Sequence, residues 1–224
     1  MEKVDVYKLV RSRRKTLCLQ IKENGNLIVR APLFLSKKSI VKFLKEKKSW
    51  IQKNKKKITN SFKLKPKKFI NGESFLYLGK KYKLEIKEGA KTPLVLERAS
   101  FIISEKNPKK AKEIFKAWYK EKAKTKITER VKIYSRITGL KFNSIKITSA
   151  KKRLGSCSYK NDLNFTWRLI LAPLEILDSV VVHELAHIKE KNHSKKFWKK
   201  VEEINPEYSL HKKWLKENGY LLSF

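Results

Sequence analysis

The sequence predicts an α+β fold, in which a basic β-rich lobe over residues 1–104 precedes a mainly helical core over residues 105–224. Two observations favour this division. The first half contains short stretches of alternating apolar and polar residues, separated by Gly, Asn and Pro, which is typical of strands. In the second half, apolar residues recur every three or four positions over longer segments, which is typical of helices. One such helical segment carries the pentapeptide His183-Glu184-Leu185-Ala186-His187.

Short strands are expected in the first thirty residues. Their apolar positions are Val4, Val6 and Leu9-Val10 in one run, Leu17, Leu19 and Ile21 in a second, and Leu27 and Val29 in a third. Asn24-Gly25 lies between the last two runs and is a strong signal of a two-residue hairpin. Cys18 faces away from its apolar neighbours, so we expect it to be inert.

A helix is expected from its N-cap at Ser36 to about Lys57, followed by a polar, basic connection over residues 59–68. Residues 69–104 return to strands, with 75–77 paired to 82–86 through Gly79-Lys80, and 94–96 paired to 101–103. We therefore expect the lobe to be mostly antiparallel. It contains no catalytic motif.

The second half begins with a long helical pattern. Asn107-Pro108 is a typical helix start, Thr138-Gly139 ends the pattern, and a break is predicted near Lys124-Thr125. A strand follows at residues 145–147. The strict alternation of apolar residues from 163 to 171 predicts a half-buried strand.

Three helices complete the chain. The first opens at Ala172-Pro173 and is apolar on most sides, so we expect a buried and rigid helix that carries the pentapeptide. Ser194 is a typical cap for the next helix. The last covers residues 208–218 and is stopped by Gly219.

The pentapeptide points to metal chemistry. His183 and His187 are four residues apart and share one helix face, the usual arrangement of an H-E-x-x-H zinc helix. Glu184 lies beside the metal, where it can accept a proton from a metal-bound water. His193 supplies a third nitrogen once the chain turns back after Lys191-Asn192. Three protein ligands with an open fourth position characterise catalytic zinc, so we expect one Zn²⁺ per chain.

Composition bounds the class and the location of the protein. Hydrophobic content of 41% is typical of a globular chain. The charged N-terminus has no secretory signal, and no apolar run approaches the ~20 residues that span a bilayer. The two cysteines, Cys18 and Cys157, form neither a disulfide framework nor a Cys metal motif. We therefore expect a cytoplasmic protein with no membrane partner.

The net charge of +35 leaves two interpretations open. Residues 1–104 carry 28 basic and 8 acidic side chains, and residues 105–224 carry 28 and 13, so the excess is spread along the chain. It indicates either non-specific affinity for nucleic acid or a lysine-rich composition without a specific role. Only nine of the basic residues are Arg, the better reader of phosphates and bases.

Four sequence segments resemble the YgjP-type metal-dependent hydrolases, which are predicted zinc metallopeptidases related to the SprT and WLM proteases. The matching segments are residues 153–158 (RLGSCS), 167–173 (WRLILAP), 181–187 (VVHELAH), and 192–194 (NHS) with Phe197-Trp198. Leu154 and Thr166 depart from the family, which usually has Trp and often Asn there. The spacing of the three histidines also suits metzincins, but Glu190 replaces the required Gly and no Met-turn follows, so we reject that class.

The resemblance implies a small gluzincin-like (zincin) core behind a β-rich N-terminal region. It also implies that His183, His187 and His193 bind the metal and that Glu184 is the general base. The expected reaction is peptide hydrolysis by a metal-activated water. Two rivals stay open: a nucleic-acid-binding module with a non-catalytic metal site, and an SprT-like protease recruited to DNA.

Other candidate residues follow from chemistry alone. Tyr208, His211 and Arg168 are candidates to stabilise the oxyanion. A strand over Gly155–Ser158 either pairs with an extended substrate, as edge strands do, or is an ordinary core strand. In the first case Gly155, Ser156 and Cys157 are candidate substrate-binding residues. Cys157 is unlike a nucleophile, because no histidine free of metal duty partners it. The sequence predicts a protein or peptide substrate but indicates neither its identity nor the oligomeric state.

Overall fold

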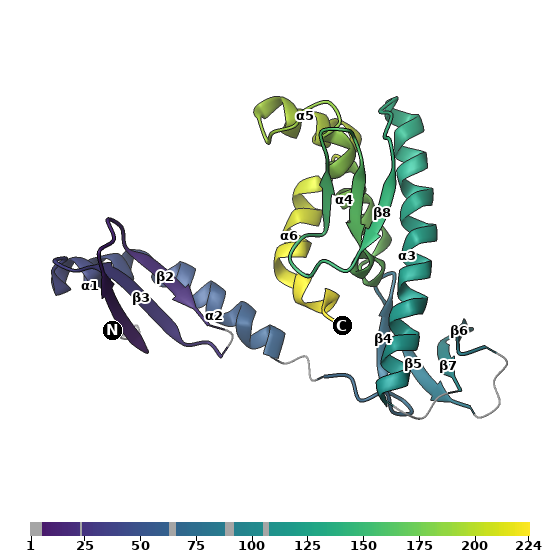
Figure 1. Cartoon of the computed structure of the whole chain (residues 1–224), viewed down its shortest axis with the longest axis horizontal. Coiled ribbons are helices and arrows are strands. Elements are labelled where there is room, and N and C mark those ends of the chain that lie inside the picture. The colour runs from purple at the N-terminus through teal and green to yellow at the C-terminus, as the bar shows by residue number, and fades with distance from the viewer. Residues whose placement is uncertain (1–5, 23, 63–65, 88–91, 105–107) are drawn as a thin grey trace. The chain divides into compact units, whose positions relative to one another are not determined.

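The computed structural model describes residues 6–22, 24–62, 66–87, 92–104 and 108–224. The chain forms two compact units, Met1–Lys65 and Pro66–Phe224 (Figure 1). This division corrects the expected boundary between residues 104 and 105. The strands after Pro66 belong with the second unit, because Phe75 and Phe101 share a core with Phe115 on the long helix.

In the first unit a three-stranded sheet packs on two helices. The strands are β1 (Lys8–Ser12), β2 (Cys18–Ile21) and β3 (Leu27–Pro32), in the order β1-β3-β2. The Asn24-Gly25 hairpin is confirmed, since β2 and β3 are antiparallel, whereas β1 and β3 are parallel. The core consists of Leu27, Val29, Ala31, Ile40, Leu44 and Ile51.

The helix expected from Ser36 is divided into α1 (Lys37–Glu46) and α2 (Lys48–Phe62). Ser36 is the N-cap, because its hydroxyl accepts a hydrogen bond from the amide of Ser39. Lys47 ends α1, and its amide still donates to the carbonyl of Phe43. The apolar residues of this segment thus belong to two helices. The second, α2, extends beyond the predicted end at residue 57.

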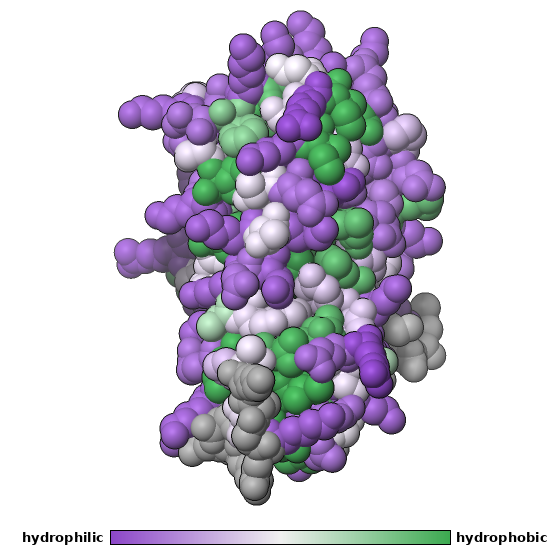
Figure 2. Space-filling view, turned by 90° about the vertical axis from the view of Figure 1, so that its right-hand side faces the viewer, coloured by the Kyte–Doolittle hydropathy of each residue, from purple (hydrophilic) through white to green (hydrophobic). Residues whose placement is uncertain are grey.

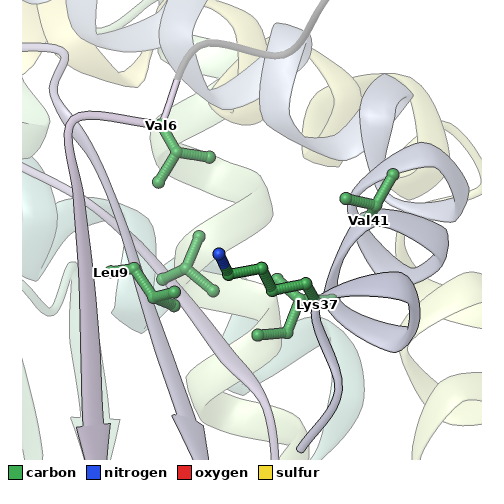
Figure 3. Close-up of a pocket in the computed structure, with 6 residues that line it drawn as sticks. Val6, Leu9, Lys37 and Val41 are labelled. Carbon is green, nitrogen blue, oxygen red and sulfur yellow. The ribbon is translucent and has the colours of Figure 1, made fainter.

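A shallow apolar hollow lies between β1 and α1 of this unit. Val6, Leu9 and Val41 surround it, and the side chain of Lys37 reaches across it towards Val6 and Leu9 (Figure 3).

The turn after β3 is held by Arg11, whose Nη1 donates to the carbonyls of Pro32, Leu33 and Leu35.

The second unit contains two sheets. β4 (Ser74–Tyr77), β5 (Lys80–Ile86), β6 (Leu94–Glu97) and β7 (Ser100–Ile103) form a mixed sheet in the order β4-β5-β7-β6. Both expected hairpins are confirmed, but β5 and β7 are parallel. β8 (Ile145–Thr148), β9 (Gly155–Cys157) and β10 (Leu163–Thr166) form the other sheet, in which β9 is an edge strand.

Helix α3 (Pro108–Thr138) runs unbroken along this unit (Figure 1). The break expected near Lys124-Thr125 does not occur, and the helix continues through both residues. The Thr125 hydroxyl donates to the carbonyl of Glu121 one turn earlier. Gly139 ends the helix with a positive φ of 68°.

Hydrophilic residues cover much of the face that Figure 2 shows, with hydrophobic residues between them.

The strand predicted from residue 163 to 171 is wrong in its second half. β10 ends at Thr166, and Trp167–Leu171 forms the 3₁₀ helix η1, in which Trp167, Leu169, Ile170 and Leu171 are all buried. The carbonyls of Ile170 and Leu171 accept from the amides of Leu78 and Gly79 in the β4–β5 turn. The apolar residues of this segment are explained by burial of η1 in the core, not by one buried face of a sheet.

The remaining helices are α4 (Leu174–Ala186), α5 (Lys195–Ile204) and α6 (Tyr208–Asn218), followed by the 3₁₀ helix η2 (Gly219–Leu222). The cap at Ser194 is confirmed by its bond from the amide of Phe197. Among the described helices, none combines the length and the apolar character that crossing a bilayer requires.

Candidate metal centre

Helix α4 is a rigid support for the site. Ten of its thirteen residues are buried, and Pro173 is its N-cap. Gly79 touches this start so closely that a Cβ there would lie 2.7 Å from Pro173 Cγ. On the next turn, Asp178 accepts two hydrogen bonds from Arg130 of α3, at 2.6 and 2.7 Å. These contacts fix the helix on which His183 and Glu184 lie.

Three imidazoles meet at the end of α4. One ring nitrogen each from His183, His187 and His193 lies within 4.8 Å of the others. His183 is in the last turn of α4, His187 is its C-cap residue, and His193 comes from the loop before α5. The buried ring of Phe197 packs against all three, at centroid distances of 4.9, 4.4 and 4.8 Å. The structure therefore brings together the three residues that the sequence predicted as ligands.

The outer nitrogens of two rings are already engaged. His187 Nδ1 lies 2.9 Å from the carbonyl oxygen of Glu190, to which it can only donate, so its Nε2 keeps a free lone pair. His183 Nδ1 lies 3.0 Å from the hydroxyl oxygen of Tyr208. Such outer partners fix the tautomer and orientation of metal-binding histidines.

This donor set fits a zinc ion. The Nε2 atoms of His183 and His193 are 3.2 Å apart, close to the ~3.3 Å between two nitrogens of a tetrahedral site with Zn–N bonds of about 2.0–2.1 Å. Burial, with the neighbouring His187 and His193, lowers the pKa of His183 to about 4. His183 is therefore neutral at physiological pH, as a ligand must be.

Glu184 lies under the edge strand β9. It is 6% exposed, and burial raises the pKa of its carboxyl group to about 7. Gly155 leaves the room for it, because a Cβ at Gly155 would lie 2.6 Å from both Cγ and Oε1 of Glu184. A glycine in a strand often marks close approach of another backbone or a ligand. Here the group that approaches Gly155 is the Glu184 side chain.

Lys191 connects the ligand loop to the turn between β9 and β10. Its amino group donates to the carbonyl of Ser158 at 3.0 Å and to Oδ1 of Asn161 at 2.7 Å, and it lies 3.9 Å from Cys157 Sγ. Since Lys191 is two residues before His193, these bonds hold the loop that presents the third imidazole. The sequence does not reveal this role, because all three partners are more than 29 residues away.

A cleft of about 250 Å³ opens beside His183, whereas His187 and His193 do not line it. His183, Glu184, Gly155 and Tyr208 all line it. Burial, and to a lesser extent Glu184, raises the pKa of the Tyr208 phenol to about 12, so the hydroxyl is protonated at neutral pH.

Other sequence candidates have different surroundings. Arg168 donates to the carbonyls of Ser149 and Ala150 and stacks over Trp167. His211 contacts Asn205 and Glu207. Neither these two residues nor Ser156 and Cys157 line the cleft. Burial raises the pKa of the Cys157 thiol, which argues against a nucleophile.

Three imidazoles around one point, with a buried carboxylate beside them, define the chain as a candidate metalloenzyme. Its sequence matches the YgjP-like metallopeptidase domain over residues 15–218, so the chain belongs to the YgjP-like family of metal-dependent peptidases. No curated protein matches it.

A solved structure with some likeness is the metallopeptidase zymogen abylysin of Pyrococcus abyssi. It is 21% identical over 42% of this chain and 95% of its own length, with a TM-score of 0.38. At that TM-score the likeness is no evidence of a shared overall fold.

Proposed function

We propose that this protein is a zinc-dependent peptidase in which His183, His187 and His193 bind one Zn²⁺ and Glu184 is the general base. The observation that carries the proposal is the cluster of three imidazole nitrogens within 4.8 Å of one another. An all-imidazole set favours zinc among the metals that peptidases use, and three protein ligands leave a position open.

Bound zinc supplies Lewis acidity, which acidifies water and polarises the scissile carbonyl. Glu184 handles the proton. Burial raises the pKa of its carboxyl group to about 7 in the metal-free site. Beside the bound metal the carboxylate would accept a proton from the attacking water and return it to the leaving amine. The surrounding burial that raises this pKa also keeps bulk water from the carboxylate.

Tyr208 is the best-supported candidate for stabilising the oxyanion. When His183 uses Nε2 for the metal, its Nδ1–H donates to the Tyr208 oxygen across 3.0 Å. The phenolic hydrogen is then free, and Tyr208 lines the cleft where the carbonyl oxygen would become negative. Arg168 and His211 are poor candidates, because their polar atoms contact groups outside the cleft.

The edge strand β9 supports an extended peptide as substrate. Among the described strands it pairs only with β10, through Gly155, Ser156 and Cys157. Its other edge is available for a peptide that adds a strand. Such a peptide would lie next to Glu184, because Gly155 packs on that carboxylate.

The test compares wild-type protein with a Glu184→Gln variant. Elemental analysis should find one zinc per chain in both proteins, and only the wild type should cleave an unfolded protein substrate. The amide has nearly the shape of the carboxylate but cannot take the proton. Unchanged turnover in the variant would refute the role of Glu184 as general base. Wild-type protein without zinc would refute the proposed zinc site.

A second candidate function is recruitment of this peptidase to nucleic acid. The observation that favours it is the charge of the first unit, where residues 6–22 and 24–55 carry 15 Lys and Arg side chains but a single Glu. Such a surface attracts phosphates without reading bases. A non-catalytic binding module is the remaining rival, and the Glu184→Gln comparison separates it from an enzyme.

A further inference from the structure

Besides the proposed catalytic groups, the cleft has an apolar part of its wall, here called the apolar extension. Leu154, Val180 and Leu215 line it, from the segment before β9, from α4 and from α6. The cleft volume of about 250 Å³ is several times the ~30 Å³ that a water molecule occupies in the liquid, so it can hold a side chain. Its walls come from three elements that also carry Gly155, Glu184 and Tyr208.

A polar group interrupts these apolar walls. Ser179 lines the same cleft and is four residues before His183, so the two residues share one face of α4. Ser179 is 1% exposed, and its hydroxyl has no hydrogen-bond partner in the part of the chain that the structure describes. A buried hydroxyl without a partner is costly, and a ligand that pairs with it regains that free energy.

The charges around the cleft select the kind of polar group that could pair with Ser179. Arg153 also lines the cleft and disfavours a cationic side chain. The carboxyl group of Glu184, which lines the same cleft, disfavours an anionic one. A neutral group that can form hydrogen bonds satisfies both conditions and the hydroxyl.

We propose that this extension is a subsite for the substrate side chain next to the scissile bond, and that it selects an apolar stem with a neutral hydrogen-bonding tip, as in glutamine. The stem packs on Leu154, Val180 and Leu215, and the tip bonds to the hydroxyl of Ser179. The inference rests on the proposed peptidase function and adds a substrate class to it.

The test uses peptides that differ only at the residues flanking the cleaved bond. Glutamine is compared with norleucine, which has a similar unbranched length but no polar tip. Wild-type protein should prefer glutamine by about tenfold or more in kcat/KM, because an unpaired polar group penalises the analogue. Ser179→Ala should remove the preference by losing activity on the glutamine peptide alone. Ser209→Ala, at an exposed position on α6, is the matched control. A preference that survives Ser179→Ala, or is absent from wild type, overturns the subsite.

A binding experiment separates the subsite from the peptidase. In the zinc-loaded Glu184→Gln variant, calorimetry should show tighter binding of the glutamine peptide than of the norleucine peptide. Adding Leu215→Trp fills the extension and should weaken binding of both. Selective binding without any wild-type cleavage would refute the peptidase and keep the subsite. Cleavage without selectivity would keep the peptidase and refute the subsite.

Discussion

Gly155 and Glu184 are in contact across the interface between β9 and α4, because residue 155 has no side chain that would hold them apart. A Cβ at residue 155 would lie 2.6 Å from Glu184 Oε1 and 2.8 Å from Cδ. Because the carboxylate is buried, it has little room to move away. The edge strand and the proposed general base are therefore fitted to each other.

We predict that Gly155→Ala displaces Glu184 and lowers kcat/KM by about 10²-fold, as a misplacement of roughly 1 Å does. Zinc content should stay near that of wild type, because the three atoms nearest to the new methyl group all belong to Glu184 and none to a histidine. Gly219→Ala is the control, since nothing lies within 4 Å of its added Cβ. Full activity in Gly155→Ala would show that Glu184 tolerates the shift.

His193→Ala should lose most of its zinc while the fold survives. His193 is exposed and lies in a loop, so its removal leaves the core intact, but it takes away one of three ligands. Elemental analysis after dialysis, with circular dichroism as the measure of folding, checks the result. Near-stoichiometric zinc would move the third ligand to a carboxylate such as Glu202 or Glu203.

Lys191→Met should weaken zinc binding about tenfold without removing a ligand, which is a typical effect of losing a group that orients ligands. The variant loses the bonds to Ser158 and Asn161 that hold the loop before His193. Competition with a chelator measures the affinity. The exposed Lys189→Met variant has the same charge change and should bind zinc like wild type.

Asp162 makes the stability of this region depend on pH. Hydrogen bonds from Ser144, Asn143 and Ser158 lower the pKa of its carboxyl below the ordinary 3.8. Since the folded state binds this proton more weakly than the unfolded state, the stabilisation is complete at neutral pH and is lost as pH falls through the lowered pKa.

Asp162→Asn should therefore lower the free energy of unfolding at pH 7. Its difference from wild type should shrink as the pH falls below the ordinary carboxyl value of 3.8 and through the lowered pKa of Asp162. Urea unfolding of the metal-free wild type and variant, at pH 7 and at acidic pH, measures this difference. A difference that stays constant with pH would mean that the carboxylate contributes by shape alone.

Several local features of the structure could be predicted from the sequence because their causes lie within a few residues. The Ser36 and Ser194 caps, the Asn24-Gly25 hairpin and the four-residue spacing of His183 and His187 are of this kind. The cause is a hydrogen bond or a helical period that the neighbouring residues already contain.

Other features depend on partners that are distant in the sequence. Trp167–Leu171 alternates like a strand, but the turn at Leu78 and Gly79 takes up its carbonyls and the core surrounds it. Lys67, in the connection expected to be polar and basic, donates to the carbonyl of Ser74 and lies over the ring of Phe75. The unpaired hydroxyl of Ser179 is equally invisible in the sequence.

If the charge of the first unit recruits nucleic acid, reversing part of it should abolish the effect. Lys38, Lys42 and Lys45 are exposed on one face of α1, and their replacement by Glu should weaken binding to DNA. The slope of log affinity against log salt should fall by about 0.7–0.9 for each phosphate that the variant no longer neutralises. DNA should stimulate proteolysis by the wild type but not by this variant.

The control for this experiment reverses Lys112, Lys120 and Lys124, which are exposed on α3 and carry the same charge. A titration at about 50 and 200 mM salt distinguishes the cases. Equally weak binding by wild type and both variants would leave the charge of the first unit without a role in nucleic-acid binding. Lys63 and Lys65, in the basic connection expected over residues 59–68, lie outside the described residues.

The three imidazoles belong to parts of the chain with different exposure. His183 and His187 lie on or next to the buried helix α4, whereas His193 is in an exposed loop held by Lys191. Segments with few buried contacts open far more often than the core does. Metal exchange can therefore follow the opening rate of residues 188–194 rather than the rate of global unfolding. Zinc would then leave and return while α3 and α4 stay folded. The half-life of bound zinc would report the opening rate of the loop over residues 188–194.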